Sequence, residues 1–94
     1  MINVWIHSNI ARLANNKLDW EFEPENEQTS LYEILKNIFA NERNLFFGII
    51  DETGVVRKHI NIFIGDTNIK DLEGLNTSIK DGGDVSIFTA ISGG

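Results

Sequence analysis

Hydrophobic and polar residues alternate along three short stretches of the chain, and this alternation predicts three half-buried strands. The stretches are INVWIH at 2–7, HINIFIGD at 59–66 and DVSIFTA at 84–90. Side chains two positions apart share one face of a strand, so isoleucine and valine form one face of each stretch. We therefore expect a sheet with one aliphatic face toward a core and a second face of polar and aromatic side chains.

A fourth strand is expected at LDWEFE, residues 18–23. It follows the polar sequence Asn15-Asn16-Lys17, and asparagine tolerates the left-handed conformation that tight hairpin turns need. Pro24 ends the strand because proline lacks the N–H group that a sheet ladder uses. The turn predicts that this strand runs antiparallel to the first.

The segment from Ser30 to Asn41 has the pattern of an amphipathic helix. Ser30 and Glu33 stand at the spacing of a capping box, in which the two residues satisfy free N–H groups of the first turn. Apolar residues recur three and four positions apart and form a single stripe. Its members are Leu31, Ile34, Leu35, Ile38 and Phe39. A single stripe means one buried face, so we expect the helix to lie across the sheet.

Two segments have weaker patterns. Phe46–Ile50 is apolar and precedes the turn sequence DETG, which is typical of either a short strand pair or a loop that closes one edge of the core. Residues 67–84 are rich in turn-forming residues. Their expected core anchors are Ile69, Leu72, Leu75 and Ile79.

The order strand, strand, helix, strand, loop, strand predicts an α+β fold, with a mixed sheet and one helix packed on one face. This is the order of the β-grasp, or ubiquitin-like, fold, in which the first and last strands lie side by side at the centre. We expect residues 1–90 to form the β-grasp domain. Residues 91–94 would then be a flexible C-terminal tail that ends in Gly93-Gly94.

Composition and charge exclude several classes of function. The 94 residues include 8 Lys and Arg against 14 Asp and Glu, for a formal net charge of −6, which argues against a nucleic acid or an anionic membrane as partner. Without cysteine there is no thiol nucleophile, disulfide or thiolate metal site. We find no apolar run of about 20 residues and no signal peptide, so a cytoplasmic location is expected.

No group of residues suggests catalysis by the domain itself. His7 and His59 are the only histidines, and no triad or metal-ligand spacing surrounds them. The acidic pairs Asp51-Glu52 and Asp81 with Asp84 are typical of turns and lack the ligand spacing of a calcium loop. We therefore expect neither an enzyme nor a metal site.

Large aromatic residues are expected on the sheet face opposite the helix. If the first, third and last of the alternating strands are neighbours, Trp5, Phe63 and Phe88 all emerge there. An apolar cluster on a solvent face suggests a surface that binds another protein. In the alternative, the segment 46–56 folds over these side chains. We add Ile91, in the tail, to this expected set of partner-binding residues.

The terminal Gly93-Gly94 pair suits a carboxylate that another protein activates. Glycine has no side chain, so the pair would pass through a narrow channel and adopt backbone angles that other residues resist. The carboxylate would attack the α-phosphate of ATP and form an acyl-adenylate. In the alternative, the pair is a frayed end without function.

Residues 59–94 combine a strand, an acidic turn, a series of regularly spaced residues, a last strand and the Gly-Gly end. The spaced residues are Leu75, Thr77, Ile79, Asp81, Gly82, Asp84, Val85 and Ile87. In this arrangement the segment resembles the ubiquitin-like sulfur carriers of the MoaD/ThiS type. It departs from them at DGGD, which has one glycine more than the usual DGD, and at Thr89, where many relatives have proline.

The resemblance implies a cycle of sulfur transfer. An E1-like adenylating enzyme of the MoeB/ThiF type would bind the apolar sheet face and use ATP to adenylate Gly94. A sulfur-donor protein would then convert Gly94 to a thiocarboxylate, and a biosynthetic enzyme would accept the sulfur for a cofactor or metabolite. The carrier itself would bind no cofactor. Two alternatives remain: a protein modifier conjugated through Gly94, and a ubiquitin-like binding module with an inert tail.

Overall fold

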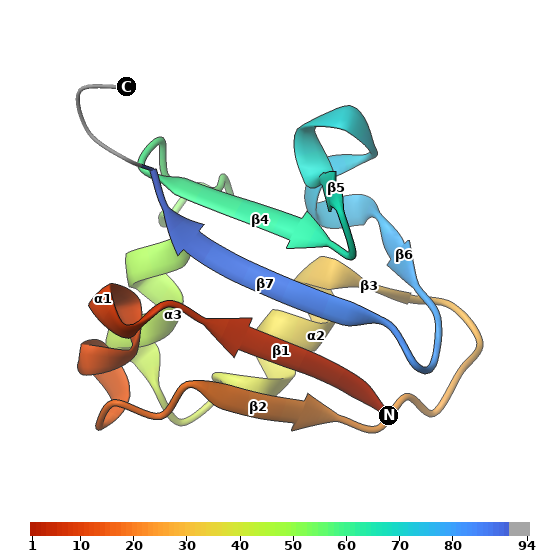
Figure 1. Cartoon of the computed structure of the whole chain (residues 1–94), viewed down its shortest axis with the longest axis horizontal. Coiled ribbons are helices and arrows are strands. Elements are labelled where there is room, and N and C mark those ends of the chain that lie inside the picture. The colour runs from red at the N-terminus through yellow and green to blue at the C-terminus, as the bar shows by residue number, and fades with distance from the viewer. Residues whose placement is uncertain (91–94) are drawn as a thin grey trace.

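The computed structural model describes residues 1–90, and its centre is a five-stranded mixed sheet (Figure 1). The strands stand in the order β2-β1-β7-β4-β5. Their bounds are β1 Ile2–Ile6, β2 Asp19–Phe22, β4 Ile60–Ile64, β5 Thr67–Asn68 and β7 Asp84–Thr89. β1 and β7 pair in parallel, whereas the other neighbours are antiparallel. The predicted central position of the first and last strands is therefore confirmed.

Register between the central strands separates two kinds of side chain. Val4 lies opposite Val85 and Ile6 opposite Ile87, so the aliphatic residues of β1 and β7 share one face. On β4, Ile62 pairs with Ile87 and extends that face. All these residues are at most 1% exposed. Burial of the aliphatic face supplies most of the hydrophobic driving force of the sheet.

The helix α2, Leu31–Ile38, packs on this aliphatic face, as predicted. The Ser30 side chain caps it and accepts a hydrogen bond from the Glu33 N–H group at 3.2 Å. The helix ends at Ile38, three positions before Asn41, because the chain leaves helical geometry at Phe39. Phe39 remains in the core and packs edge to face against Trp20 at 4.9 Å between ring centroids.

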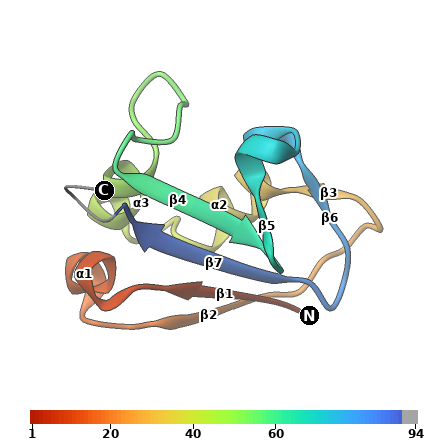
Figure 2. The ribbon, with the colours of Figure 1, turned by 45° about the horizontal axis from the view of Figure 1, so that its top comes forward.

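A second helix, α3 at Arg43–Ile49, replaces the strand pair or loop that the sequence suggested. Leu45 and Ile49 stand four residues apart and are both fully buried, which directs one face of α3 into the core. Figures 1 and 2 place α2 and α3 on the same side of the sheet. The turn after α3 is confirmed, and a single bridge joins Ile50 to Val56 around it.

The connection between β1 and β2 is longer than the predicted hairpin turn. It contains the short helix α1, Ser8–Ala11, and a 3-10 turn η1, Arg12–Ala14, before Asn15 and Asn16 close it with positive φ angles of 55° and 61°. The left-handed asparagines are therefore confirmed. Helix α1 forms because His7 caps it, with Nδ1 accepting from the Asn9 N–H group at 3.0 Å.

Short elements complete the domain between β4 and β7. They are the 3-10 turns η2 Ile69–Asp71 and η3 Gly74–Asn76, and β6 Ser78–Ile79, which pairs with β3 Thr29–Ser30. Ile69 and Ile79 are buried and Leu75 is partly buried, as expected for anchors. Leu72 is 44% exposed, so its predicted place in the core is wrong.

The additional glycine of DGGD fits the turn that leads into β7. Gly82 has φ +89° and donates to the Met1 carbonyl at 3.0 Å, while the Gly83 carbonyl accepts from Asn3 at 3.1 Å. A Cβ atom at Gly83 would lie 2.8 Å from Cγ2 of Ile79. The positive φ of Gly82 and the close approach at Gly83 therefore favour glycine at both positions of this turn.

Candidate functional site

Three aromatic side chains form a contiguous cluster on the sheet face opposite α2. Trp5 on β1, Phe88 on β7 and Phe63 on β4 lie on adjacent strands. The ring centroids are 5.3 Å apart for Trp5 and Phe88 and 5.9 Å apart for Phe88 and Phe63. Each ring is only partly buried. We call this cluster the aromatic face.

Within residues 1–90 no element covers the aromatic face. The alternative placed the segment 46–56 over it, but α3 lies on the opposite side of the sheet, where Leu45 and Ile49 enter the core. Figure 1 looks onto the open side, with the strands in front of the helices. The predicted position of the three rings on an uncovered face is therefore confirmed, while their role in binding stays a prediction.

A hollow extends from the aromatic face to the end of β7. Phe63, Phe88 and His7 line it together with Thr89 and Ala90. Its other lining groups are the polar residues Asn9, Asn61, Ser86 and Asp66, with Gly65. The face is thus apolar in its middle and polar at its rim, which is the usual anatomy of a protein-binding surface.

Hydrogen bonds hold the end of β7 in place. Thr89 pairs with Ile60, and the Ala90 N–H group donates to the His59 carbonyl at 2.6 Å. On the other side, His7 donates to the carbonyl of Ile87 at 2.9 Å. The chain therefore leaves the sheet at a defined point beside the aromatic face. The remaining predicted site residues, Ile91, Gly93 and Gly94, lie outside the described residues.

The histidines have structural surroundings. His7 caps α1 and packs edge to face on Trp5 at 6.1 Å, and His59 is an exposed residue before β4. In the part of the chain that the structure describes, no group of three His, Asp or Glu side chains could hold a metal ion. None of the helices described there is long and apolar enough to cross a membrane.

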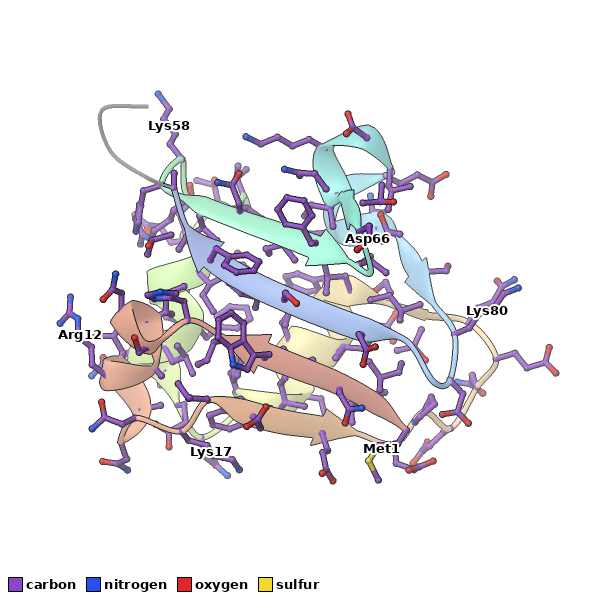
Figure 3. All side chains as sticks on the ribbon, in the orientation of Figure 1. Met1, Arg12, Lys17, Lys58, Asp66 and Lys80 are labelled. Atoms are coloured by element: carbon purple, nitrogen blue, oxygen red, sulfur yellow. The ribbon has the colours of Figure 1, made fainter. Side chains whose placement is uncertain are left out.

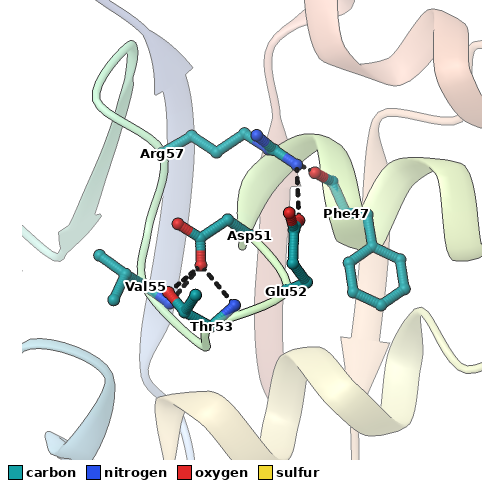
Figure 4. Close-up of polar contacts among 6 residues, drawn as sticks. All are labelled: Phe47, Asp51, Glu52, Thr53, Val55 and Arg57. Carbon is teal, nitrogen blue, oxygen red and sulfur yellow. Dashed lines mark hydrogen bonds and ion pairs between the residues drawn. The ribbon is translucent and has the colours of Figure 1, made fainter.

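Asp51 has a pKa below its ordinary value because it closes the turn after α3 (Figure 4). Its carboxylate accepts from the Thr53 hydroxyl at 2.6 Å, from the Thr53 N–H group at 2.8 Å and from the Val55 N–H group at 3.1 Å. These bonds favour the charged form. Because Asp51 is only partly buried and its partners are local, the shift indicates a turn and not a catalytic acid.

The chain matches the ThiS family over residues 11–94. The chain belongs to the ThiS family. Proteins of this family are small ubiquitin-like carriers that serve as non-catalytic co-substrates and bind no cofactor. The resemblance seen in residues 59–94 is thus confirmed and extends over most of the chain.

Solved structures with the same fold include CysO of Mycobacterium tuberculosis, with 20% identity and a TM-score of 0.80 over 97% of this chain and 100% of that one. A second structure, CysO in a BexX/CysO complex of Amycolatopsis orientalis, has 19% identity and a TM-score of 0.84. The match covers 100% of this chain and 100% of that one. The small archaeal modifier protein 1 of Methanosarcina acetivorans has 26% identity and a TM-score of 0.77 over 99% and 95% of the two chains. No curated protein sequence matches. The β-grasp fold predicted from the element order is therefore confirmed.

Sequence reasoning missed the surroundings of the β7 end. Helix α1 and its His7 cap were hidden in what looked like a simple turn, and α3 was not recognised. The sequence offers one signal for α3, because the apolar residues Leu45 and Ile49 stand four positions apart, at helical spacing.

Proposed function

We propose that the protein is a sulfur carrier whose terminal glycine, Gly94, is adenylated and then converted to a thiocarboxylate. The observation that carries the proposal is the family match, which runs to Gly94 and includes Gly93-Gly94. The position of β7 supports it, since the last central strand ends beside the aromatic face. We divide the chain into a β-grasp domain, residues 1–90, and a C-terminal arm, residues 91–94.

Activation is the first chemical step. A carboxylate oxygen of Gly94 attacks the α-phosphorus of ATP, an acyl-phosphate bond forms, and pyrophosphate leaves. An E1-like adenylating enzyme of the MoeB/ThiF type supplies ATP and the groups that stabilise the transition state. Glycine at 93 and 94 leaves the reacting carbonyl without a neighbouring Cβ. The carrier contributes the carboxylate and its presentation.

Sulfur transfer is the second step. Sulfide from a sulfur-donor protein attacks the adenylated carbonyl of Gly94, the carbon–sulfur bond forms, and AMP leaves with the oxygen. The resulting thiocarboxylate is a sulfur nucleophile that a biosynthetic enzyme uses to build a cofactor or metabolite. Because this sulfur is bound to a carbonyl carbon, the carrier has no need of cysteine.

The aromatic face is the proposed docking surface for these partners. Four residues beyond Ala90 span at most about 14 Å when fully extended, so an enzyme that holds Gly94 must lie close to the end of β7. Trp5, Phe63 and Phe88 are the large apolar groups nearest to that end on the open face, and Ile91 would extend the contact. The relative CysO, found in a complex with BexX, supports docking of this fold on another protein.

The test is incubation of the carrier with a cognate adenylating enzyme, Mg-ATP and sulfide. Intact-protein mass spectrometry should show replacement of one oxygen by sulfur. A variant that lacks Gly94 and a variant with one alanine added after Gly94 should both remain unchanged. If the native carrier forms neither adenylate nor thiocarboxylate with any adenylating enzyme of its own genome, the proposal is wrong.

Conjugation to proteins is the second candidate. It is favoured by one observation, the similarity to a small archaeal modifier protein. In this case the activated carbonyl of Gly94 forms an isopeptide bond with a lysine amine. Adducts of higher mass in cell extracts, present with the native carrier and absent without Gly94, would identify this function.

A further inference from the structure

A second hollow lies on the helix side of the β7 end, and its charge is opposite to that of the protein as a whole. It opens between α1, η1, α3 and the start of β4. Its cationic and imidazole groups are Arg12, Arg57 and His59, and Leu13 and Phe47 provide apolar surface between them. No carboxylate lines it in the described part of the chain, although the formal net charge is −6. We call it the basic hollow.

The arginines of the basic hollow differ in how firmly they are held. Arg57 is anchored, since its Nε–H group donates to the Phe47 carbonyl at 2.5 Å (Figure 4). Its backbone N–H group also donates to the Ile49 carbonyl at 2.9 Å. Glu52 lies 3.8 Å from Nη2 of Arg57 and is itself largely exposed, so it partly neutralises this charge. Arg12 is exposed in η1 and has no ion pair in the described residues.

The opposite end of the sheet is acidic. A polar depression there contains Glu21, Glu23, Glu25 and Glu33 and no lysine or arginine. β2 runs antiparallel to β1, and Phe22 pairs with Ile2, which places Glu21 and Glu23 at the start of β1. β7 runs parallel to β1, so its end and the basic hollow lie at the other extremity. Figure 3 likewise shows Arg12 and Lys58 far from Lys80 and Met1.

We propose that the basic hollow binds an acidic segment of the adenylating enzyme, with an apolar side chain seated against Leu13 and Phe47. Three features favour this occupant. The basic hollow is amphipathic. It shares Thr89 with the hollow beside the aromatic face. The charge separation of the domain also orients the β7 end toward a negatively charged surface. The inference rests on the proposed function. It adds a charged contact on the helix side to the apolar contact on the sheet side.

The test measures ATP–pyrophosphate exchange by the cognate adenylating enzyme as a function of carrier concentration and salt. Arg12→Glu should lower kcat/KM for the carrier about tenfold at low salt, with kcat unchanged, because it weakens encounter and docking and not the chemistry. Arg57→Gln should act in the same direction and more weakly. Added salt should reduce the difference between native carrier and Arg12→Glu.

Lys80→Glu is the matched control, since it makes the same change of net charge at the opposite extremity of the domain. It should stay within about twofold of the native carrier. Thermal unfolding of each variant checks that the fold is retained. Equal effects of Arg12→Glu and Lys80→Glu would overturn the inference and leave the proposed function standing.

Two other outcomes identify different errors. If the native carrier supports no exchange at all, the proposed function fails and the inference fails with it. If Arg12→Glu instead abolishes a dimer that light scattering detects in the carrier alone, the occupant of the basic hollow is the acidic end of a second copy. That result would also overturn the inference.

Discussion

The two faces of the central sheet share the same strands and differ in almost every other respect. On the helix side, alternate residues of β1, β4 and β7 are isoleucine and valine. Those excluded from solvent are Ile2, Val4, Ile6, Ile60, Ile62, Val85 and Ile87. On the open side, the intervening residues are aromatic or polar and remain partly exposed. Within β7, the buried Ile87 and the partly exposed Phe88 are adjacent in sequence.

If the aromatic face is the docking surface that we propose, residues that stabilise the fold and residues that bind partners are adjacent in the sequence of each strand. β-Branched aliphatic side chains pack tightly under the helices and stabilise the fold through burial. Aromatic side chains on the open face keep a large surface available at little cost in rotamer freedom, which suits a contact that forms and breaks with successive partners. Substitutions on the two faces should therefore have different consequences.

The largest effect is expected from the helix side. Ile87→Ala should lower the free energy of unfolding by about 3 kcal/mol, because it removes buried methyl groups and leaves a cavity under α2. Urea denaturation measures the change, and Ile87→Val should cost only about 1 kcal/mol. A loss under 1 kcal/mol for Ile87→Ala would mean that the core collapses around the site and is less tightly packed than described.

Phe88→Ala should affect partner binding more than the stability of the fold. We expect a stability loss of about 1 kcal/mol, since the ring is already partly exposed, and a loss of affinity for the adenylating enzyme of about thirtyfold, as for a hot-spot residue. Calorimetric titration and thermal unfolding measure the two quantities. Asn3→Ala, on the same face at the other end of β1, is the control and should bind normally. Unchanged binding by Phe88→Ala would exclude the aromatic face as the docking surface.

Ser30→Ala should lower the stability of the fold by a smaller amount and leave partner affinity unchanged. It removes the side-chain acceptor of the Glu33 N–H group and should destabilise α2 by about 1 kcal/mol. Since α2 covers only the helix side, affinity for partners at the aromatic face should be unchanged. Thermal unfolding and calorimetric titration test this, with Ser30→Asp as a variant that restores the cap. A binding defect in Ser30→Ala with normal unfolding would mean that the two faces are coupled.

The smallest effect concerns the acid side of the stability curve. Hydrogen bonds from the Thr53 side chain, and then from Val55, lower the pKa of Asp51 below its ordinary value in the folded protein. A lowered folded-state pKa stabilises the fold above the unfolded-state value, and this contribution is lost as pH falls through the folded-state pKa. Asp51→Asn should therefore have a slightly lower Tm than the native protein at neutral pH, and the gap should close in acid. A constant gap would refute this.

Much of this architecture follows from local patterns. The strict alternation in β1, β4 and β7, the stripe of α2 and the Ser30 cap are properties of neighbouring residues, and all were predicted correctly. The helix α3 was not, because Phe46–Ile50 is apolar over a stretch too short to distinguish a strand from a helix. Burial of Leu45 and Ile49 against the core decided for a helix.

The candidate sites divide in the same way. Trp5, Phe63 and Phe88 could be assigned to one face from alternation and strand order, and the Gly-Gly motif is readable without any structure. The basic hollow could not be predicted from the sequence, because Arg12 and Arg57 are 45 residues apart along the chain. They come together only through packing of η1 against α3. No local pattern marks them.

Local patterns in the chain account for the alternation that makes one sheet face apolar, for the amphipathic helix that covers it and for the family to which the chain belongs. Those features depend on residues a few positions apart, whose geometry the backbone dictates. The set of side chains around the end of β7 became known from the folded chain alone. That arrangement depends on contacts between distant segments, whose free energy comes from burying surfaces that no single segment contains.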